Sequence, residues 1–201
     1  MRLESLRVQN FGPFADFAVD LTTLPEEAKL VAVVGPNGSG KSTLLELFTG
    51  GALFRECPTR GSLTALATSR AAVLEARVVN GSRWTIRHTV DGTSGKGESV
   101  VLDEQGRPAT SDAKVRSFDA FAASHFPPPA VLYASSVSPQ GSGGFLELRA
   151  GDRKAVLLRV LGVERLEELA KAARERARAA GVELSTLQAR IVDEERRGGD
   201  V

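Results

Sequence analysis

The sequence predicts an α/β domain, in which an antiparallel β subdomain and a partly parallel sheet combine with helices, followed by a projecting coiled-coil helix. Three observations predict this class. Alternating and apolar runs fill residues 1–34 and end at a glycine-rich turn. β-branched residues with turn signals fill 71–103. From Asp152 onward the chain is rich in Leu, Ala, Glu and Arg and contains no proline.

Composition sets the outer limits. The chain has 201 residues, of which 42% are hydrophobic, with 26 Lys+Arg against 25 Asp+Glu. These values predict one soluble globular domain or slightly more and exclude a mainly disordered chain. No stretch approaches the roughly 20 apolar residues of a membrane span, and the opening lacks a signal peptide. We therefore expect a cytoplasmic protein with no membrane partner.

The N-terminal part predicts strands over 3–8, 14–21 and 30–34, and then a helix from Ser42 to about Phe48. Three further runs, 71–79, 83–90 and 99–102, predict a meander of antiparallel hairpins. A helix is expected from a Ser111 cap to His125. After the prolines at 127–129, residues 130–134 are expected to form a buried strand.

The C-terminal segment predicts a short helix, a break at Gly162, and one long helix from Glu164 to Arg197. Eight apolar residues in it are spaced alternately by four and three: Leu166, Ala170, Ala173, Ala177, Ala180, Leu184, Leu187 and Ile191. This heptad seam is narrow and predicts a partner helix, although an amphipathic helix packed on its own domain is the alternative. We therefore expect a domain over 1–162 and the base of a coiled coil over 163–201.

One motif carries chemistry. Residues 35–42 read Gly-Pro-Asn-Gly-Ser-Gly-Lys-Ser and fit G-x-x-x-x-G-K-[ST], between an apolar run and a helix. Backbone N–H groups of such a loop cradle phosphates, its lysine neutralises the β/γ-phosphates, and its serine hydroxyl binds Mg²⁺. The sequence therefore predicts a site for a nucleotide and Mg²⁺. Its binding residues are Asn37, Gly38, Ser39, Gly40, Lys41, Ser42 and Thr43.

Hydrolysis needs more than this loop, and two segments bear on it. Asp103 follows the apolar run 100–102 and could end a Walker B strand, but Asp-Glu-Gln-Gly at 103–106 has the composition of a hairpin turn, which we favour. Gln140 follows the run 130–134, from where a glutamine could reach the metal and the γ-phosphate. On its own, this position is more typical of a surface loop.

Several of these segments together resemble SbcC, the ATPase subunit of the SbcCD nuclease. The resemblance rests on the opening 2–14, the P-loop, the strand Arg-Trp-Thr-Ile-Arg at 83–87, and Pro-Gln-Gly at 139–141 followed by 145–148 and 152–154. It implies the N-terminal lobe of an ABC/SMC-type ATPase head, associated with the nucleoid. It also implies that Lys41 and Gln140 are catalytic, and that Gln140 and Ser42 bind the metal. Gly12 and Pro13 depart from some relatives, which carry a basic or small polar residue there.

The resemblance implies partners as well. They are the C-terminal half of the same head, which brings the signature and Walker B motifs, a second head in an ATP-dependent homodimer, an SbcD/Mre-type nuclease, and double-stranded DNA. Without that half the chain is expected not to hydrolyse ATP. With a net charge of +1, DNA contacts need local cations. The candidates are Arg55, Arg60, Arg83, Arg107 and Lys114.

Three other functions remain open. Another SMC-like ATPase, such as a RecF-like, RecN-like or phage recombination protein, shares the opening strands and the P-loop. A self-contained P-loop kinase or GTPase would use Asp103. A transporter-type nucleotide-binding module is disfavoured, because a heptad helix follows Gln140 where a compact helical subdomain should lie.

Overall fold

The computed structural model describes residues 1–25, 27–28, 30–138, 144–161 and 163–198. It divides into two compact units, Met1–Leu148 and Arg149–Val201. The sequence predicted a different division, between a domain over 1–162 and the base of a coiled coil over 163–201. That division is by function, and it stays a prediction.

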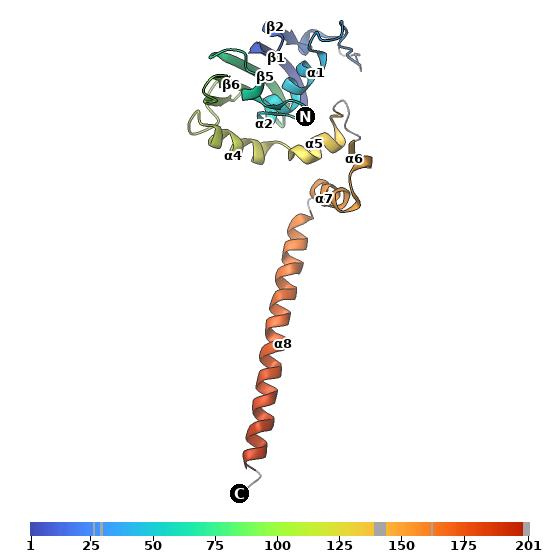
Figure 1. Cartoon of the computed structure of the whole chain (residues 1–201), viewed down its shortest axis with the longest axis vertical. Helices are drawn as coiled ribbons and strands as arrows, with labels where there is room; N and C mark the ends of the chain where they lie inside the picture. The colour runs from blue at the N-terminus through green and yellow to red at the C-terminus, as the bar shows by residue number, and fades with distance from the viewer. Residues whose placement is uncertain (26, 29, 139–143, 162, 199–201) are drawn as a thin grey trace. The chain divides into compact units, whose positions relative to one another are not determined.

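The first unit is built on a five-stranded sheet with the order β2-β1-β5-β6-β7 (Figure 1). The strands are β1 (Arg2–Phe11), β2 (Phe14–Asp20), β5 (Ala72–Asn80), β6 (Ser82–Val90) and β7 (Gly97–Leu102). Each neighbouring pair is antiparallel. The hairpin prediction is therefore confirmed. The partly parallel sheet is not found among the described residues.

The hydrophobic core lies on one face of this sheet, because alternate residues of each strand point to the same side. On β5, Leu74, Ala76 and Val78 are buried in this way. One core cluster joins β1 and β5 to the helical run that starts at Lys41, and a second joins β5, β6 and β7 to later helices. The helical run at Lys41 is therefore fixed to the sheet by its apolar side.

That helical run is continuous and longer than expected. It consists of α1 (Lys41–Glu46), a π-helical turn, η2 (Leu47–Gly51), and α2 (Ala52–Phe54). The expected helix over 42–48 is confirmed and extended. Gly50 lies where a β-carbon would overlap the Tyr133 hydroxyl and the Glu56 carbonyl oxygen. Only glycine lets these groups approach so closely.

The helix α4 (Val115–His125) begins later than expected, so the Ser111 cap is wrong. Residues before it are used by the sheet, because Ser99 N donates to Ala113 O at 2.8 Å. Asp112 instead receives the Lys114 N–H at 3.0 Å. A hydrogen bond from the Ser117 side chain is the largest cause that lowers the pKa of Asp112 to about 2.

Residues 130–134 are also not a strand. They belong to α5 (Pro129–Ser135), in which Pro129 occupies the first helical turn. Proline suits that position because its fixed φ is helical and its missing N–H is not needed there. The apolar pattern of this run reflects the burial of Leu132, which is 2% exposed.

The strand expected over 30–34 is absent as well. No strand is assigned there, and Leu30 and Val34 are each 87% exposed. A strand needs hydrogen-bonding neighbours, and no described segment pairs with this run. The described residues therefore do not bury the apolar side chains of this run.

The shorter elements of the first unit join these parts. They are η1 (Leu21–Thr23), β3 (Glu56–Cys57), β4 (Gly61–Ser62), α3 (Leu63–Leu66) and α6 (Gly144–Glu147). The second unit contains α7 (Ala150–Val160) and α8 (Glu164–Gly198), a single helix of 35 residues (Figure 1). The short and long helices expected here are confirmed.

A buried histidine ties α2 to the sheet. His88 is fully buried, and its Nε2–H donates to Ala52 O at 2.9 Å. Its Nδ1 accepts from the Ser99 hydroxyl at 2.9 Å, which in turn accepts from Arg55 at 2.8 Å. Burial is the main cause that lowers the pKa of His88 to about 4.

This histidine predicts acid sensitivity. An unfolded histidine titrates near pH 6.5, so the folded state, which keeps His88 neutral, loses stability as the pH falls from about 6.5 towards 4. The loss should approach about 3 kcal/mol. Urea unfolding near pH 7 and near pH 4.5 measures it, with His88→Gln as the control that removes the titration. An equal pH dependence in both proteins would contradict the prediction.

Candidate nucleotide-binding site

The glycine-rich loop has the backbone geometry of a phosphate cradle. Gly38 and Gly40 have φ of 83° and 96°, a region that glycine enters without strain. Ser39 N donates to Pro36 O at 3.3 Å, and Leu44 N donates to Gly40 O at 2.8 Å, so the loop turns directly into α1. The N–H groups at the start of α1 therefore point out of the helix towards the loop.

Lys41 lies inside this loop. Its ammonium donates to Gly35 O at 2.9 Å and to Pro36 O at 2.7 Å. An ammonium has three N–H donors. Two of them hold the charge against the loop, and the third can serve a phosphate oxygen.

A cavity of about 480 Å³ opens over the loop. It is lined by Pro13, Asn37, Gly38, Gly40, Lys41, Ser42, Thr43 and Arg60. All the expected binding residues except Ser39 are therefore brought together. Arg60 is an addition to them, because the sequence suggested it only for DNA.

The turn between β1 and β2 closes one side of the site. A β-carbon on Gly40 would lie 2.6 Å from Pro13 Cγ and 2.8 Å from Phe14 Cζ. Gly40 is therefore required by the approach of this turn as well as by its own φ. The departure from relatives at Pro13 thus places an apolar ring in the wall of the site.

These residues fit a nucleoside triphosphate with Mg²⁺. Lys41 and Arg60 supply two positive charges, Ser42 and Thr43 supply hydroxyls, and the glycines leave the backbone open to phosphate oxygens. Mg²⁺ takes most of its ligands from phosphate and water, so one hydroxyl from the protein is sufficient at the loop. Among the described residues, no group of three or more His, Cys, Asp or Glu could hold a metal.

Gln140, expected to bind the metal, lies outside the described residues. Its role therefore stays a prediction.

In the described part of the chain, no helix is both long and apolar enough to cross a membrane.

Asp103 is part of a turn, as the sequence favoured. Its Oδ1 accepts from Gln105 N at 2.9 Å and from Arg107 N at 2.8 Å, and its Oδ2 accepts from Arg107 Nε at 2.8 Å. The hydrogen bond from Arg107 N is the main cause that lowers the pKa of Asp103. Asp103 directly follows β7, which is an edge strand of the antiparallel sheet. Both carboxylate oxygens serve the turn, which does not suit a metal ligand.

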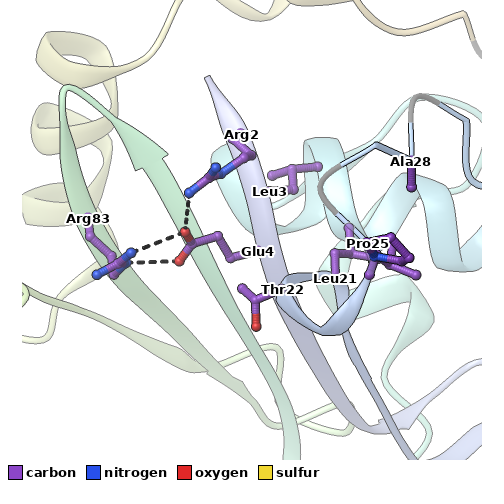
Figure 2. A pocket seen from close by; sticks show the side chains of 9 residues that line it. Arg2, Leu3, Glu4, Leu21, Thr22, Pro25, Ala28 and Arg83 are labelled. Atoms are coloured by element: carbon purple, nitrogen blue, oxygen red, sulfur yellow. Dashed lines mark hydrogen bonds and ion pairs between the residues drawn. The ribbon is translucent and has the colours of Figure 1, made fainter.

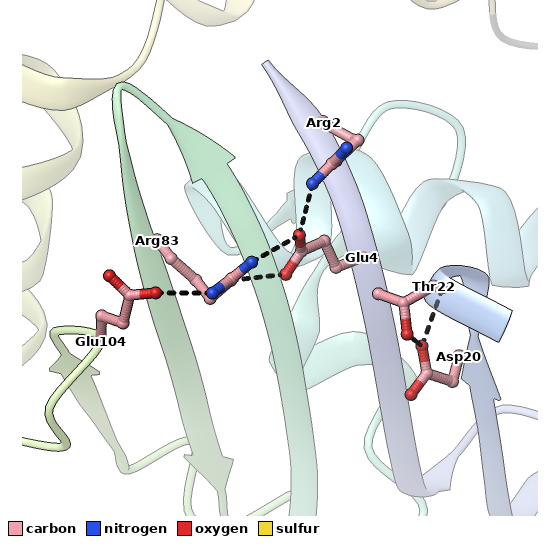
Figure 3. Close-up of polar contacts among 6 residues, drawn as sticks. All are labelled: Arg2, Glu4, Asp20, Thr22, Arg83 and Glu104. Atoms are coloured by element: carbon pink, nitrogen blue, oxygen red, sulfur yellow. Dashed lines mark hydrogen bonds and ion pairs between the residues drawn. The ribbon is translucent and has the colours of Figure 1, made fainter. Parts of the chain in front are cut away.

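A second cavity, of about 400 Å³, lies at the start of β1 (Figure 2). It also contains two arginines, but Glu4, whose side chain is 3% exposed, pairs with both of them. Arg83 Nε donates to Glu4 at 2.9 Å, and Arg2 donates at 2.8 Å (Figure 3). The Arg83 hydrogen bond is the main cause that lowers the pKa of Glu4. Both arginines of this cavity are thus engaged by a carboxylate, whereas the P-loop cavity has two cations and no acid in its lining, so this cavity is a poorer phosphate site.

Most of the cations expected to bind DNA already have acidic or polar partners. Arg83 also pairs with Glu104 at 2.6 Å, Arg107 with Asp103 at 2.8 Å, and Lys114 with Asp112 at 3.0 Å. Arg55 is largely buried and donates to Ser99. Burial is the main cause that lowers its pKa. These four side chains are therefore poor candidates for phosphate contacts.

Two curated relatives match parts of this chain. Over 46 residues, 23% of this chain and 4% of the relative, it is 52% identical to the "Chromosome partition protein Smc" of Methylococcus capsulatus. It is 44% identical over 63 residues to the "Sulfate/thiosulfate import ATP-binding protein CysA 1" of Rhizobium meliloti, which is 31% of this chain and 16% of the relative. The chain thus matches only a small part of either relative.

The solved "SMC head domain from Thermotoga maritima" matches with a TM-score of 0.37 at 23% identity, over 54% of this chain and 39% of that one. The model of the AAA domain family matches residues 5–114, which is more than half of the chain. The chain therefore belongs to the AAA domain family and has the fold of an α/β P-loop ATPase.

Proposed function

We propose that this chain is the ATP-binding N-terminal lobe of an SbcC-like ATPase, which works with a nuclease on DNA ends in double-strand-break repair. One observation carries the proposal. The same chain joins a phosphate cradle at Lys41 to a 35-residue helix whose apolar seam is exposed. A compact P-loop kinase has no use for such a helix.

In this proposal the cradle binds ATP with Mg²⁺. Lys41 neutralises the β/γ-phosphates, the Ser42 hydroxyl binds the metal, and the N–H groups of 38–43 surround the phosphates. Gln140 would be a further ligand of the metal. Arg60 would add a second positive charge at the phosphates, because it lines the same cavity as Lys41.

The C-terminal half of the head is the proposed partner of the run 30–34. Val31 and Val33 are 51% and 42% exposed, and Leu30 and Val34 are 87% exposed. An apolar run next to the P-loop suits a buried strand of a parallel sheet, which needs neighbours on both sides. A strand from that half would supply the hydrogen bonds that the described residues do not offer to this run.

The seam on α8 is the proposed base of a coiled coil. All eight of its residues are exposed, and Leu166 and Leu184 are 63% and 59% exposed. A returning antiparallel helix would bury them. The nuclease would bind at the root, near Leu166 and Leu169, while double-stranded DNA and a second head would bind the assembled head.

The root can be tested by mutation. We expect Leu166→Glu/Leu169→Glu to abolish co-elution of the nuclease with the reconstituted head in size-exclusion chromatography, because it places one charge in the seam at Leu166 and a second beside the seam at Leu169, at the proposed nuclease site. The matched control, Leu187→Glu/Ile191→Glu, changes the same seam about 30 Å away and should retain the nuclease. Retention by the root variant, with ATP binding intact, would show that the nuclease binds elsewhere.

A chromosome-partition SMC protein is the second candidate, and the local match to Smc favours it. It has the same cradle and the same seam, so these features do not separate the two. The nuclease does separate them. If neither the wild-type head nor the control variant binds an SbcD/Mre-type nuclease, the SMC alternative replaces the SbcC-like one.

A further inference from the structure

A buried carboxylate lies directly behind the phosphate cradle. Glu46 is on α1 and is 6% exposed. Its Oε2 accepts from Thr59 N at 3.2 Å, and its Oε1 accepts from the Thr59 hydroxyl. Both oxygens are thus bonded to one residue, 13 positions away in the chain.

Thr59 belongs to a tight turn. The turn joins β3 to β4, which pair at Cys57 and Gly61, and Arg60 N donates to Cys57 O at 3.1 Å. Arg60 therefore follows the anchored residue by one peptide bond. It is the residue of this turn that lines the cavity with Lys41.

The chemistry of Glu46 suggests more than packing. Removing a carboxylate from water is costly unless hydrogen bonds compensate, and an apolar side chain could fill the same space. The two hydrogen bonds that Glu46 accepts fix both the backbone N–H and the side-chain hydroxyl of Thr59 in the turn. Arg60 is long and exposed, so holding it over a phosphate costs conformational entropy unless its backbone is already fixed.

We propose that Glu46 is a positioning residue that, through Thr59, holds Arg60 in the P-loop cavity and so raises affinity for the nucleotide phosphates. The inference rests on the proposed ATP binding. The P-loop helix then carries two functions on two turns. Lys41 acts at its start, and Glu46 sets the position of a second cation one turn later.

A double-mutant cycle tests this coupling by calorimetric titration of the full chain with Mg²⁺ and ATP. Thr59→Val keeps the shape and removes the hydroxyl donor, and we expect it to weaken ATP binding about five-fold. Thr59→Ser should bind ATP as tightly as the wild type, because serine keeps the hydroxyl donor. In an Arg60→Ala background, Thr59→Val should have no further effect, because the group that it positions is gone.

Thr49→Val is the matched control. Thr49 lies on the same helical run, and its hydroxyl donates to backbone oxygens of that run, to Leu45 O at 2.8 Å and to Glu46 O at 3.4 Å, rather than to the Glu46 carboxylate. It should leave affinity unchanged. If Thr59→Val weakens binding equally with and without Arg60, its effect is general destabilisation and the inference is wrong. If the wild-type chain does not bind ATP at all, the proposed function itself fails.

Discussion

Replacing Lys41 with alanine is expected to weaken binding of Mg²⁺ and ATP by about 10- to 100-fold. A charge-assisted hydrogen bond contributes about 1.5–3 kcal/mol, which corresponds to that range. The ammonium is held by Gly35 O and Pro36 O, so it is in place before the nucleotide arrives and little ordering cost is added. Isothermal titration calorimetry of the full chain measures the effect.

The control for this variant is Lys96→Ala. It removes the same charge from the same unit at a lysine that does not line the P-loop cavity. Its ATP affinity should equal that of the wild type. Equal affinities for wild type and Lys41→Ala would contradict the assignment of the site, whatever the affinity of the control.

Elements with local determinants could be predicted from the sequence. The runs 71–79 and 83–90 each show β-branched alternation and have a turn between them, and the structure pairs them as the two strands of one antiparallel hairpin. The long helix has its own period, which needs no knowledge of the rest of the fold. The P-loop was also predictable, because its spacing is set by the phosphates that it binds.

Two short apolar elements were mispredicted. The runs 30–34 and 130–134 are both short and apolar, and such runs do not distinguish a strand from a helix or an unpaired segment. Pro129 decides the second case by starting α5. In the first case, the deciding factor is a hydrogen-bonding neighbour that the described residues do not supply.

The residues of the site that are neighbours in sequence were predicted, but the residue that a later segment contributes was not. Lys41, Ser42 and their neighbours follow one another in sequence, whereas Arg60 comes to the cavity from the β3–β4 turn, to which Glu46 is hydrogen-bonded. No spacing rule connects these residues. The sequence signal for this contribution was Glu46, a charged residue that stands among Leu44, Leu45, Leu47 and Phe48 in the helix after the P-loop.

Hydrolysis by this chain alone is expected to be negligible, and addition of the C-terminal half is expected to restore it. The described residues offer no free carboxylate at the cradle, since its lining groups are cations, hydroxyls, an amide and glycine backbone. Phosphoryl transfer needs an acid near Mg²⁺ and a group that orients the attacking water. Phosphate release, measured first for this chain and then after addition of the second half, tests the expectation.

Asp103→Asn decides between this result and a self-contained enzyme. Asp103 accepts three hydrogen bonds within its own turn, so the variant should lower local stability and leave the activity of the reconstituted head unchanged. Turnover by the isolated chain at about 1 s⁻¹ or more, abolished by Asp103→Asn, would require Asp103 to leave that turn and bind the metal. That outcome would replace the split head with a kinase- or GTPase-like mechanism, because the chain would then contain its own acid.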